Sequence, residues 1–444
     1  MERDHVIWIL GLVYLFVVFA SGQADAQVRR DVSGQSSDTI ANAYREGFDA
    51  FRKRDFAAAA TAFRKAYEVN PMDDITVYFV AGAYAYAGDE TQAIEWLRKF
   101  AELKSCFAPS PTTFASLRNS EEFKRVLQKV ESTRATVHKS TVAFTIPEKD
   151  LVPEGIGYDP VGKAFYIGSL HKRKIVKITP DPLGGNPKFE DFTAEGQDGL
   201  YCVLGIKIDP KRRILWAISS AEPFMKGYTK VDDGKSGLFA YDLKTGKLIK
   251  KVIPQTSGPH LLNDLILDPK GNVFLTDTRS NEIFTLRADK NEMEVLLPPR
   301  TLETPNGITI SDDGRVLFIA SIPMGVYRLD LETKQLARLG YVQGISLAGI
   351  DGLYFYKNSL VGVLNMINGG RVARYYLNSG LDFVTGTELI ECNNPFFDDP
   401  TTGALSGNWL YYIANSQYES AFDDKGAILP IDKLHDVVIL KAKL

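Results

Sequence analysis

Six copies of a strand–turn–strand pattern fill the chain from about residue 140 onward. In each copy two β-rich runs flank a short turn, commonly Asp-Pro-x-Gly or Asp-Gly, as in DLILDPKGNVFLTD at 264–277. Alternation with period 2 is typical of strands, and such turn residues join strands into hairpins. The hairpins begin at residues 155, 205, 264, 307, 352 and 403. This pattern restricts the second part of the chain to an all-β fold made of repeated hairpins.

The spacing of the hairpins selects one such fold. Successive starts are 50, 59, 43, 45 and 51 residues apart, and most hairpins are followed by two further strand candidates. Units of four strands at about this period are propeller blades, which close into a ring with little exposed edge. We therefore predict a six-bladed β-propeller at 140–444. The last blade lacks an outer strand after residues 436–444, and STVAFTIPE at 140–148 is expected to fill that place and close the ring.

The first part of the chain has helical periodicity and repeats itself. At a shift of 34 residues, Asp55 aligns with Asp89 and Phe63 with Leu97. A period of 34 with small residues at helix crossings resembles a tetratricopeptide repeat. The alternative is a helical hairpin whose internal similarity is accidental.

This reading divides the chain into two domains, in the fold class α plus all-β. N-terminal tetratricopeptide-like helical repeats at 37–131 are followed by the six-bladed β-propeller, and the polar stretch at 132–139 is interpreted as a linker. Short stacks of helical repeats form concave surfaces, so a protein or peptide partner is expected at the helices. The sequence does not identify that partner.

The N-terminus has the character of a targeting segment. An apolar run at 6–20 is short for a membrane span, and Ala24 and Ala26 behind it fit a small-x-small cleavage site. We predict a signal peptide at 1–26 and a periplasmic or secreted protein, with an uncleaved anchor as the alternative. No later segment of the sequence is apolar enough to suggest a membrane span after signal cleavage.

Charge and cysteine content exclude several partners and cofactors. The net charge is -3 without a long basic run, which argues against nucleic acid because phosphate binding needs clustered Lys and Arg. Cys106, Cys202 and Cys392 are too few and too scattered for a disulfide framework or a Cys-x-x-Cys metal site. With an odd count, at least one thiol must stay unpaired within the chain.

The residues just before the first strand of each blade carry the chemical signal. Propeller symmetry gathers these positions around one end of the central axis, and they read Glu154, Leu204, Asn263, Asn306, Asp351 and Thr402. The two carboxylates and two amides among them offer oxygen donors, which suit a hard divalent cation such as Ca²⁺. The alternative to a metal site is that these residues have ordinary structural roles. Asn-Gly and Asp-Gly are common turn dipeptides, and Glu154 would then be a solvent-exposed side chain.

The four motifs taken in order resemble a known family. PEG, ND, PNG and DG at successive blade starts are similar to the senescence-marker-protein/gluconolactonase family of six-bladed propellers, with paraoxonases and diisopropyl fluorophosphatase as more distant relatives. The resemblance covers about residues 140–444. It implies that Glu154, Asn263, Asn306 and Asp351 bind the catalytic metal, most simply Ca²⁺, and that the reaction is hydrolysis of a lactone or related ester.

The resemblance also suggests roles around the metal, with departures. Asp351 is the expected base that activates water, and Asp264 is a second catalytic candidate or an orienting group. His260 is a candidate substrate contact, with an ordinary loop histidine as the alternative. The paraoxonase branch places a His near the channel as base, whereas the start of blade 2 here reads VLGI. The gluconolactonase branch tends to have Arg where this chain has Leu261, so the resemblance does not imply sugar-lactone specificity.

Two function classes remain open at this level. One is an exported metal-dependent lactonase or esterase with a helical interaction arm. The other is a non-catalytic propeller and repeat scaffold in the cell envelope, which the helical repeats favour because a simple hydrolase needs no such arm. Removal of the metal by a chelator, tested on lactone and ester substrates, separates the two.

Overall fold

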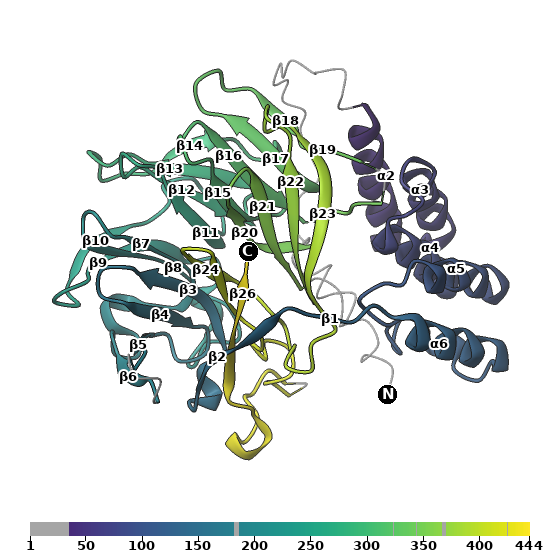
Figure 1. Cartoon of the computed structure of the whole chain (residues 1–444), viewed down its shortest axis with the longest axis horizontal. Helices are drawn as coiled ribbons and strands as arrows, with labels where there is room; N and C mark the ends of the chain where they lie inside the picture. The colour runs from purple at the N-terminus through teal and green to yellow at the C-terminus, as the bar shows by residue number, and fades with distance from the viewer. Residues whose placement is uncertain (1–34, 182–185, 323, 343, 366–369, 424) are drawn as a thin grey trace.

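The computed structural model describes residues 35–181, 186–322, 324–342, 344–365, 370–423 and 425–444, so the signal peptide predicted at 1–26 lies outside the described residues. The described N-terminal part is helical, and its helices lie together at one side of the molecule (Figure 1). They are α2 (Gln35–Arg52), α3 (Phe56–Val69), α4 (Asp74–Ala87), α5 (Glu90–Glu102) and α6 (Glu121–Thr133). Along the described chain, none of the helices is both long and apolar enough to cross a membrane.

The aligned aspartates of the helical part have the same structural role. Asp55 caps α3 by accepting a hydrogen bond from the backbone N–H of Ala58, and Asp89 caps α5 in the same way through Gln92. Each such cap satisfies a backbone donor that the helix itself leaves unpaired. The 34-residue similarity therefore reflects two helices that begin alike, while the tetratricopeptide assignment stays a prediction.

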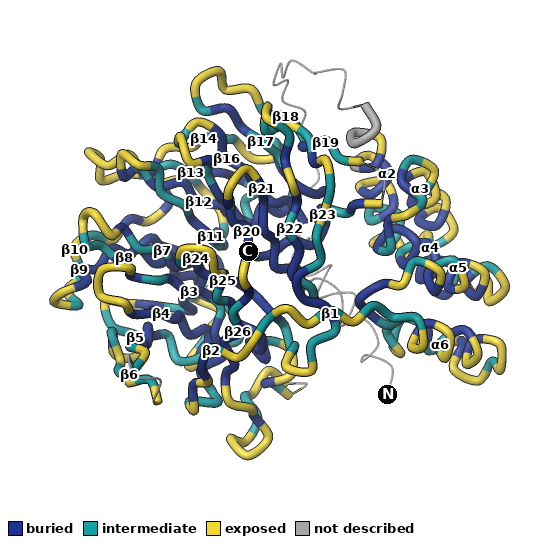
Figure 2. Tube along the Cα trace, viewed as in Figure 1, coloured by how far each residue is buried: buried dark blue, intermediate teal, exposed yellow. Residues whose placement is uncertain are grey.

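The remainder of the described chain forms six sheets around a central axis, as the hairpin spacing predicted. The first strands of neighbouring sheets contact one another, β3 with β7, β7 with β11, β11 with β15, β15 with β20, and β24 with β3. The first three sheets contain β3 (Pro153–Asp159), β4 (Ala164–Ser169), β5 (Ile175–Thr179) and β6 (Lys188–Asp191), then β7 (Cys202–Asp209), β8 (Ile214–Ser220), β9 (Ser236–Asp242) and β10 (Leu248–Val252), then β11 (Leu262–Leu267), β12 (Val273–Asp277), β13 (Glu282–Leu286) and β14 (Glu294–Leu297). The strands are largely buried, and exposed residues gather in the loops and on the outer helices (Figure 2).

The other three sheets include the closing one. They contain β15 (Pro305–Ile310), β16 (Val316–Ser321), β17 (Gly325–Asp330) and β18 (Leu336–Arg338), then β20 (Ile350–Phe355), β21 (Ser359–Leu364), β22 (Arg371–Leu377) and β23 (Phe383–Cys392) with β19 (Gly340–Tyr341) and β1 (Val137–His138) added, then β24 (Gly403–Ser406), β25 (Trp409–Ile413), β26 (Val437–Lys443) and β2 (Ser140–Ile146). β2 pairs antiparallel with β26, from Ser140 opposite Ala442 to Ile146 opposite Val437. The predicted closure of the ring by the segment before blade 1 is thereby confirmed.

The helical part packs on blades 4 and 5 at one end of the propeller. Ile350, Leu364, Arg371 and Cys392 lie side by side across blade 5, in the row where its inner strand begins. We call the end of the propeller at which the inner strands begin the mouth. Arg371 in this row forms an ion pair with Asp74 of α4, with 3.0 Å between Nη1 and Oδ2. The helices therefore flank the mouth.

Further contacts hold this arrangement on both sides of the ion pair. Asn70, after α3, donates from Nδ2 to the carbonyl of Ile345 at 3.0 Å and accepts at Oδ1 from the N–H of Gly344 at 3.2 Å. Met324 and Ala348, from the loops of blades 4 and 5, belong to the same buried apolar cluster as the helices. Buried hydrogen bonds and a shared apolar core therefore fix the helical part on the propeller, which a flexible linker alone would not do.

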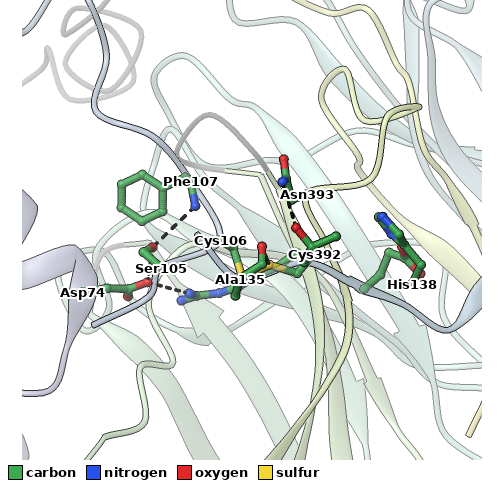
Figure 3. Close-up of a disulfide and its surroundings, with 11 residues drawn as sticks. Asp74, Ser105, Cys106, Phe107, Ala135, His138, Cys392 and Asn393 are labelled. Carbon is green, nitrogen blue, oxygen red and sulfur yellow. Dashed lines mark hydrogen bonds and ion pairs between the residues drawn. A yellow bond between two sulfur atoms is a disulfide. The ribbon is translucent and has the colours of Figure 1, made fainter. Parts of the chain in front are cut away.

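A disulfide also joins the two parts, which the sequence did not predict. Cys106, after α5, is bonded to Cys392 at the end of β23, with 5.5 Å between the Cα atoms (Figure 3). β1 adds to the outer edge of β23, with Val137 opposite Cys392 and His138 opposite Glu391. The stretch 132–139 is therefore partly ordered against blade 5 rather than a free linker. The prediction that one thiol stays unpaired is confirmed, since Cys202 is free and buried.

Candidate metal-binding site

The predicted site residues lie in strands that are irregular at the mouth. Between inner and second strand the pairing register shifts in five sheets, at Pro153/Ile156, Val203/Ile206, Leu262/Leu265, Pro305/Ile308 and Ile350/Gly352. Such bulges re-aim side chains and are frequent beside functional sites. In blade 6 the pairs run without a shift from Gly403 opposite Tyr412 to Ser406 opposite Trp409. The bulge explains how polar residues at a strand start can point toward the axis.

The glycines that follow the site residues have a packing role. A Cβ on Gly155 would lie 1.8 Å from the carbonyl oxygen of Leu204, and one on Gly307 would lie 2.2 Å from that of Asp351. Inner strands of adjacent blades therefore approach too closely at the mouth for any other residue. Glu154, Asn263, Asn306 and Asp351 all belong to strands, and none is among the residues with positive φ. The turn interpretation of Asn-Gly and Asp-Gly is therefore wrong, although the glycines alone do not indicate a metal.

Asp351 is the most enclosed of the four predicted ligands. It is 5% exposed, and its Oδ2 accepts a hydrogen bond from Asn365 Nδ2 at 2.6 Å. Burial and the charge of Asp264 raise the pKa of Asp351 to about 7, against hydrogen bonds from Asn306 and Asn365 that favour its charged form. Its carboxylate thus lies near the predicted ligand Asn306 and the second acid Asp264.

Glu154, at the start of the inner strand of blade 1, is affected by the same charges. Burial, followed by the charges of Asp351 and Asp264, raises the pKa of Glu154 well above its ordinary value. The hydroxyls of Thr401 and Thr402 from blade 6 donate to its backbone carbonyl, the first at 3.1 Å, which fixes the strand and leaves the carboxylate unbonded by them. Like charges held together away from water are a strained arrangement that a cation relieves.

Asn263 is oriented by a neighbour that the sequence analysis missed. Its Nδ2 donates to Thr278 Oγ1 at 2.9 Å, and Thr278 in turn donates to the carbonyl of Pro305 at 2.7 Å. With the amide nitrogen held in this way, Oδ1 is the atom that Asn263 offers to a cation. Thr278 follows β12 and Asn365 follows β21, so both could have been found by asking which residue the hairpin places opposite each site residue.

Asp264 has a different environment from the other two acids. Its Oδ1 lies 3.2 Å from Lys207 Nζ and accepts the N–H of Leu265 at 2.8 Å, while Oδ2 accepts the N–H of Ile308 at 3.4 Å. It is 2% exposed. A carboxylate with its own cation and backbone donors is suited to hold neighbouring strands in place, and this agrees better with the orienting role than with proton transfer.

The residues at the mouth fit a hard divalent cation. They combine carboxylate and amide oxygens, the donors that Ca²⁺ and Mg²⁺ prefer, with Lys207 compensating only Asp264. The three carboxylates do not form a tight triad, because no group of three with donor atoms within 4.8 Å of one another includes them in the described chain. A cation there would rely on the amides of Asn263 and Asn306 as well as on Glu154 and Asp351.

A tighter cluster of potential metal ligands lies beside this site, and one of its members is a histidine that is hydrogen-bonded within the protein. Donor atoms of His260, Asp277 and Glu282, all buried, lie within 4.8 Å of one another. His260 Nδ1 is 2.7 Å from Asp277 Oδ2, and Nε2 is 3.1 Å from the carbonyl of Thr256. A backbone carbonyl and a carboxylate both accept hydrogen bonds, so these partners favour a ring with hydrogen on both nitrogens, and such an imidazolium has no lone pair for a metal. The structure places His260 against these partners rather than among the mouth carboxylates, so its predicted substrate contact gains no geometric support.

The protonated state of His260 has a testable consequence. Burial opposes the charged ring, but the hydrogen bond and charge of Asp277 outweigh it, so the pKa of His260 is raised. Its stabilisation is then fully present below about pH 6.5, the unfolded value, and is lost as pH rises through the higher folded pKa. We expect His260→Gln to lower the free energy of unfolding by about 1–3 kcal/mol at pH 6 and by less at pH 9.

Thermal melts of wild type and His260→Gln across this pH range measure the effect, with the exposed His435→Gln as the matched control. A difference that does not change with pH contradicts the imidazolium. A melting temperature that zinc raises in the wild type but not in His260→Gln instead makes the cluster a metal site.

Comparisons with known proteins find matches among solved structures but none in sequence. No model of a known family matches the chain, and no curated protein matches it in sequence. Similar solved structures include a gluconolactonase from Xanthomonas campestris (12% identity, 70% of this chain and 91% of that chain, TM-score 0.48). Others are the calcium-binding protein regucalcin from Agrobacterium tumefaciens (15%, 69% and 95%, 0.46) and PQQ-bound aldose sugar dehydrogenase from Streptomyces coelicolor (13%, 69% and 99%, 0.46). At these identities and TM-scores the matches say nothing about what this chain binds or does.

Proposed function

We propose that this chain is an exported hydrolase of lactones or related esters that depends on a divalent cation of the calcium class. The observation that carries the proposal is the convergence of Glu154, Asn263, Asn306 and Asp351 on the mouth, each placed by its strand and by a bulge or a close glycine. Fixed, enclosed oxygen donors with excess negative charge are the features of a cation site.

The reaction follows from the same residues. Glu154, Asn263, Asn306 and Asp351 would hold the cation, which when bound supplies a positive charge that polarises a carbonyl and stabilises the developing oxyanion. Asn365 holds Asp351 Oδ2 by its 2.6 Å hydrogen bond, and the Asp351 carboxylate takes a proton from the attacking water. The proton then passes to the leaving alkoxide, and the products are the carboxylic acid and the alcohol, joined in one molecule when the substrate is a lactone.

Export is supported by the disulfide. The bond between Cys106 and Cys392 forms in oxidising compartments such as the periplasm or the extracellular space and is rare in the cytosol. We propose the periplasmic or secreted location on this basis together with the leader-like sequence at 1–26.

A binding scaffold is the second candidate, and the helical part is the reason to keep it. The helices are tied to blades 4 and 5 by the disulfide and by the ion pair of Arg371 with Asp74, so a partner bound there would lie beside the mouth. A protein or peptide partner at the helices stays a proposal.

Removal of the cation tests the proposed hydrolase. Calcium is expected to raise the wild-type melting temperature, because a ligand that binds only the folded state stabilises it, by about 2.7 kcal/mol at 100 times Kd. Glu154→Gln should bind calcium more weakly by calorimetry, while Glu294→Gln on the exposed outer strand β14 is the matched control. Chelation should abolish hydrolysis of aryl esters and γ- and δ-lactones. Hydrolysis that survives the chelator, with melting unaffected by calcium, contradicts the proposal.

A further inference from the structure

Three loops at the mouth present aromatic rings to one another. They are the connections between the second and third strands of blades 1, 2 and 6, and they carry His171, Phe224, Tyr418 and Phe422. Ring centroids of Phe224 and Tyr418 are 4.4 Å apart, those of Phe224 and Phe422 5.4 Å, and those of His171 and Phe422 5.8 Å. His171 Nδ1 also lies 2.8 Å from the carbonyl of Phe224. These contacts join loops from three blades. We define the aromatic wall as Phe224 of blade 2 with Tyr418 and Phe422 of blade 6, and His171 of blade 1 contacts its edge.

The wall continues inward as apolar surface. Tyr418 and Phe422 pack against a buried cluster that includes Leu170, Leu204 and Met225. Leu204 occupies the position at which blades 1, 3, 4 and 5 carry the oxygen donors, and it is 7% exposed. The start of the inner strand of blade 2 thus presents hydrocarbon where those four blades present oxygen atoms.

The wall lies close to the proposed reacting centre. The second strands of blades 1, 2 and 6 end opposite the starts of the inner strands, so the loops that follow them lie at the same end of the propeller as Glu154. Burial, followed by the charges of Glu222 and Glu154, raises the pKa of the Tyr418 phenol. Phe224, Tyr418 and Phe422 are each partly exposed rather than sealed in the core. A partly exposed aromatic surface beside enclosed polar groups is the usual composition of a small-molecule site.

The rings of the wall restrict the ligand further. Hydroxyl-rich sugar lactones find hydrocarbon on this side, where hydrogen-bonding groups would be required to replace the water that they lose.

We infer that Phe224, Tyr418 and Phe422 select lactones and esters with an alkyl or aryl substituent, which lies against the wall while the carbonyl faces Glu154 and Asp351. This inference rests on the proposed function and adds its substrate class. Burial of hydrocarbon against the wall should raise kcat/KM by up to about fourfold for each methylene that it covers.

A series of γ-lactones with one ring and a growing chain tests the inference on the full-length protein with calcium. From γ-butyrolactone through γ-hexalactone to γ-nonalactone, kcat/KM is expected to rise at least about tenfold, and glucono-δ-lactone should be poorer than γ-hexalactone. Phe224→Ala and Phe422→Ala should lower the ratio of kcat/KM for γ-nonalactone over γ-butyrolactone at least about fivefold. Phe224→Leu, which keeps an apolar side chain and tests against misfolding, should lower it less.

Trp409→Ala is the matched control, because Trp409 is a partly exposed aromatic residue at the opposite end of blade 6. Its ratio should equal that of the wild type. A wild type that hydrolyses the series without a chain-length preference, or a ratio that Phe224→Ala and Phe422→Ala leave unchanged, overturns the inference and leaves the hydrolase standing. A wild type that hydrolyses none of these lactones overturns the proposed function itself.

Discussion

Asp351→Asn is expected to lower ester and lactone hydrolysis about 100-fold or more, because a positioned base typically contributes about that factor. The substitution keeps the size of the side chain and one of its oxygens, and Asn365 remains available beside it. Calcium binding should weaken only modestly, since Glu154, Asn263 and Asn306 keep their donors. The measurements are kcat at saturating calcium and the calcium Kd by calorimetry.

Two further variants show whether the loss of activity is specific to Asp351. The exposed Asp382→Asn is the surface control, and its rate should match the wild type. Asp264→Asn should act mainly on stability, because Asp264 is held by Lys207 and by backbone N–H groups of two strands. If saturating calcium restores full turnover to Asp351→Asn, then Asp351 serves only as a ligand and the base lies elsewhere, with Asp264 the next residue to test.

The propeller could be predicted because its signals are local and repeated. Alternation within each hairpin and turn residues at regular intervals need no knowledge of distant contacts, and a last blade with three strand candidates of its own left one place for 140–148. The positions of Glu154, Asn263, Asn306 and Asp351 at the mouth followed from the same repetition. Their identity as ligands did not follow, and it remains a prediction.

The features that the sequence did not reveal depend on contacts between distant residues. Cys106 and Cys392 are separated by 286 positions, and nothing local marks them as a pair. Each of the five bulges shifts the pairing by one residue and has no distinctive composition. His260 was considered for the substrate because it lies three residues before Asn263, but its ring bonds to Asp277 across the hairpin, a partner that proximity in sequence does not indicate.

The docking of the helices changes how the two domains should be separated. A chain that begins at Ser140 keeps β2 and therefore the closed ring, whereas it loses β1 and leaves Cys392 and the apolar contacts of Met324 and Ala348 uncovered. The exposed surface would lie at the mouth of blades 4 and 5, beside Asn306 and Asp351. The helical part is thus better regarded as a fixed flank of the candidate site than as an independent arm.

Removal of the disulfide is expected to give the largest loss of stability among these variants. The double variant Cys106→Ser and Cys392→Ser should unfold with a free energy lower by about 2–4 kcal/mol, because the bond restricts the unfolded chain over a long loop. Folding should still place the helices on blade 5, since the ion pair of Arg371 with Asp74 and the pairing of β1 with β23 remain.

Urea unfolding followed by circular dichroism measures the change, with the free thiol variant Cys202→Ala as the control. A reducing agent should destabilise the wild type to the level of the double variant and leave that variant unaffected. Equal stability of oxidised wild type and double variant would mean that the ion pair, β1 and the shared apolar core are sufficient to fix the helices at the mouth.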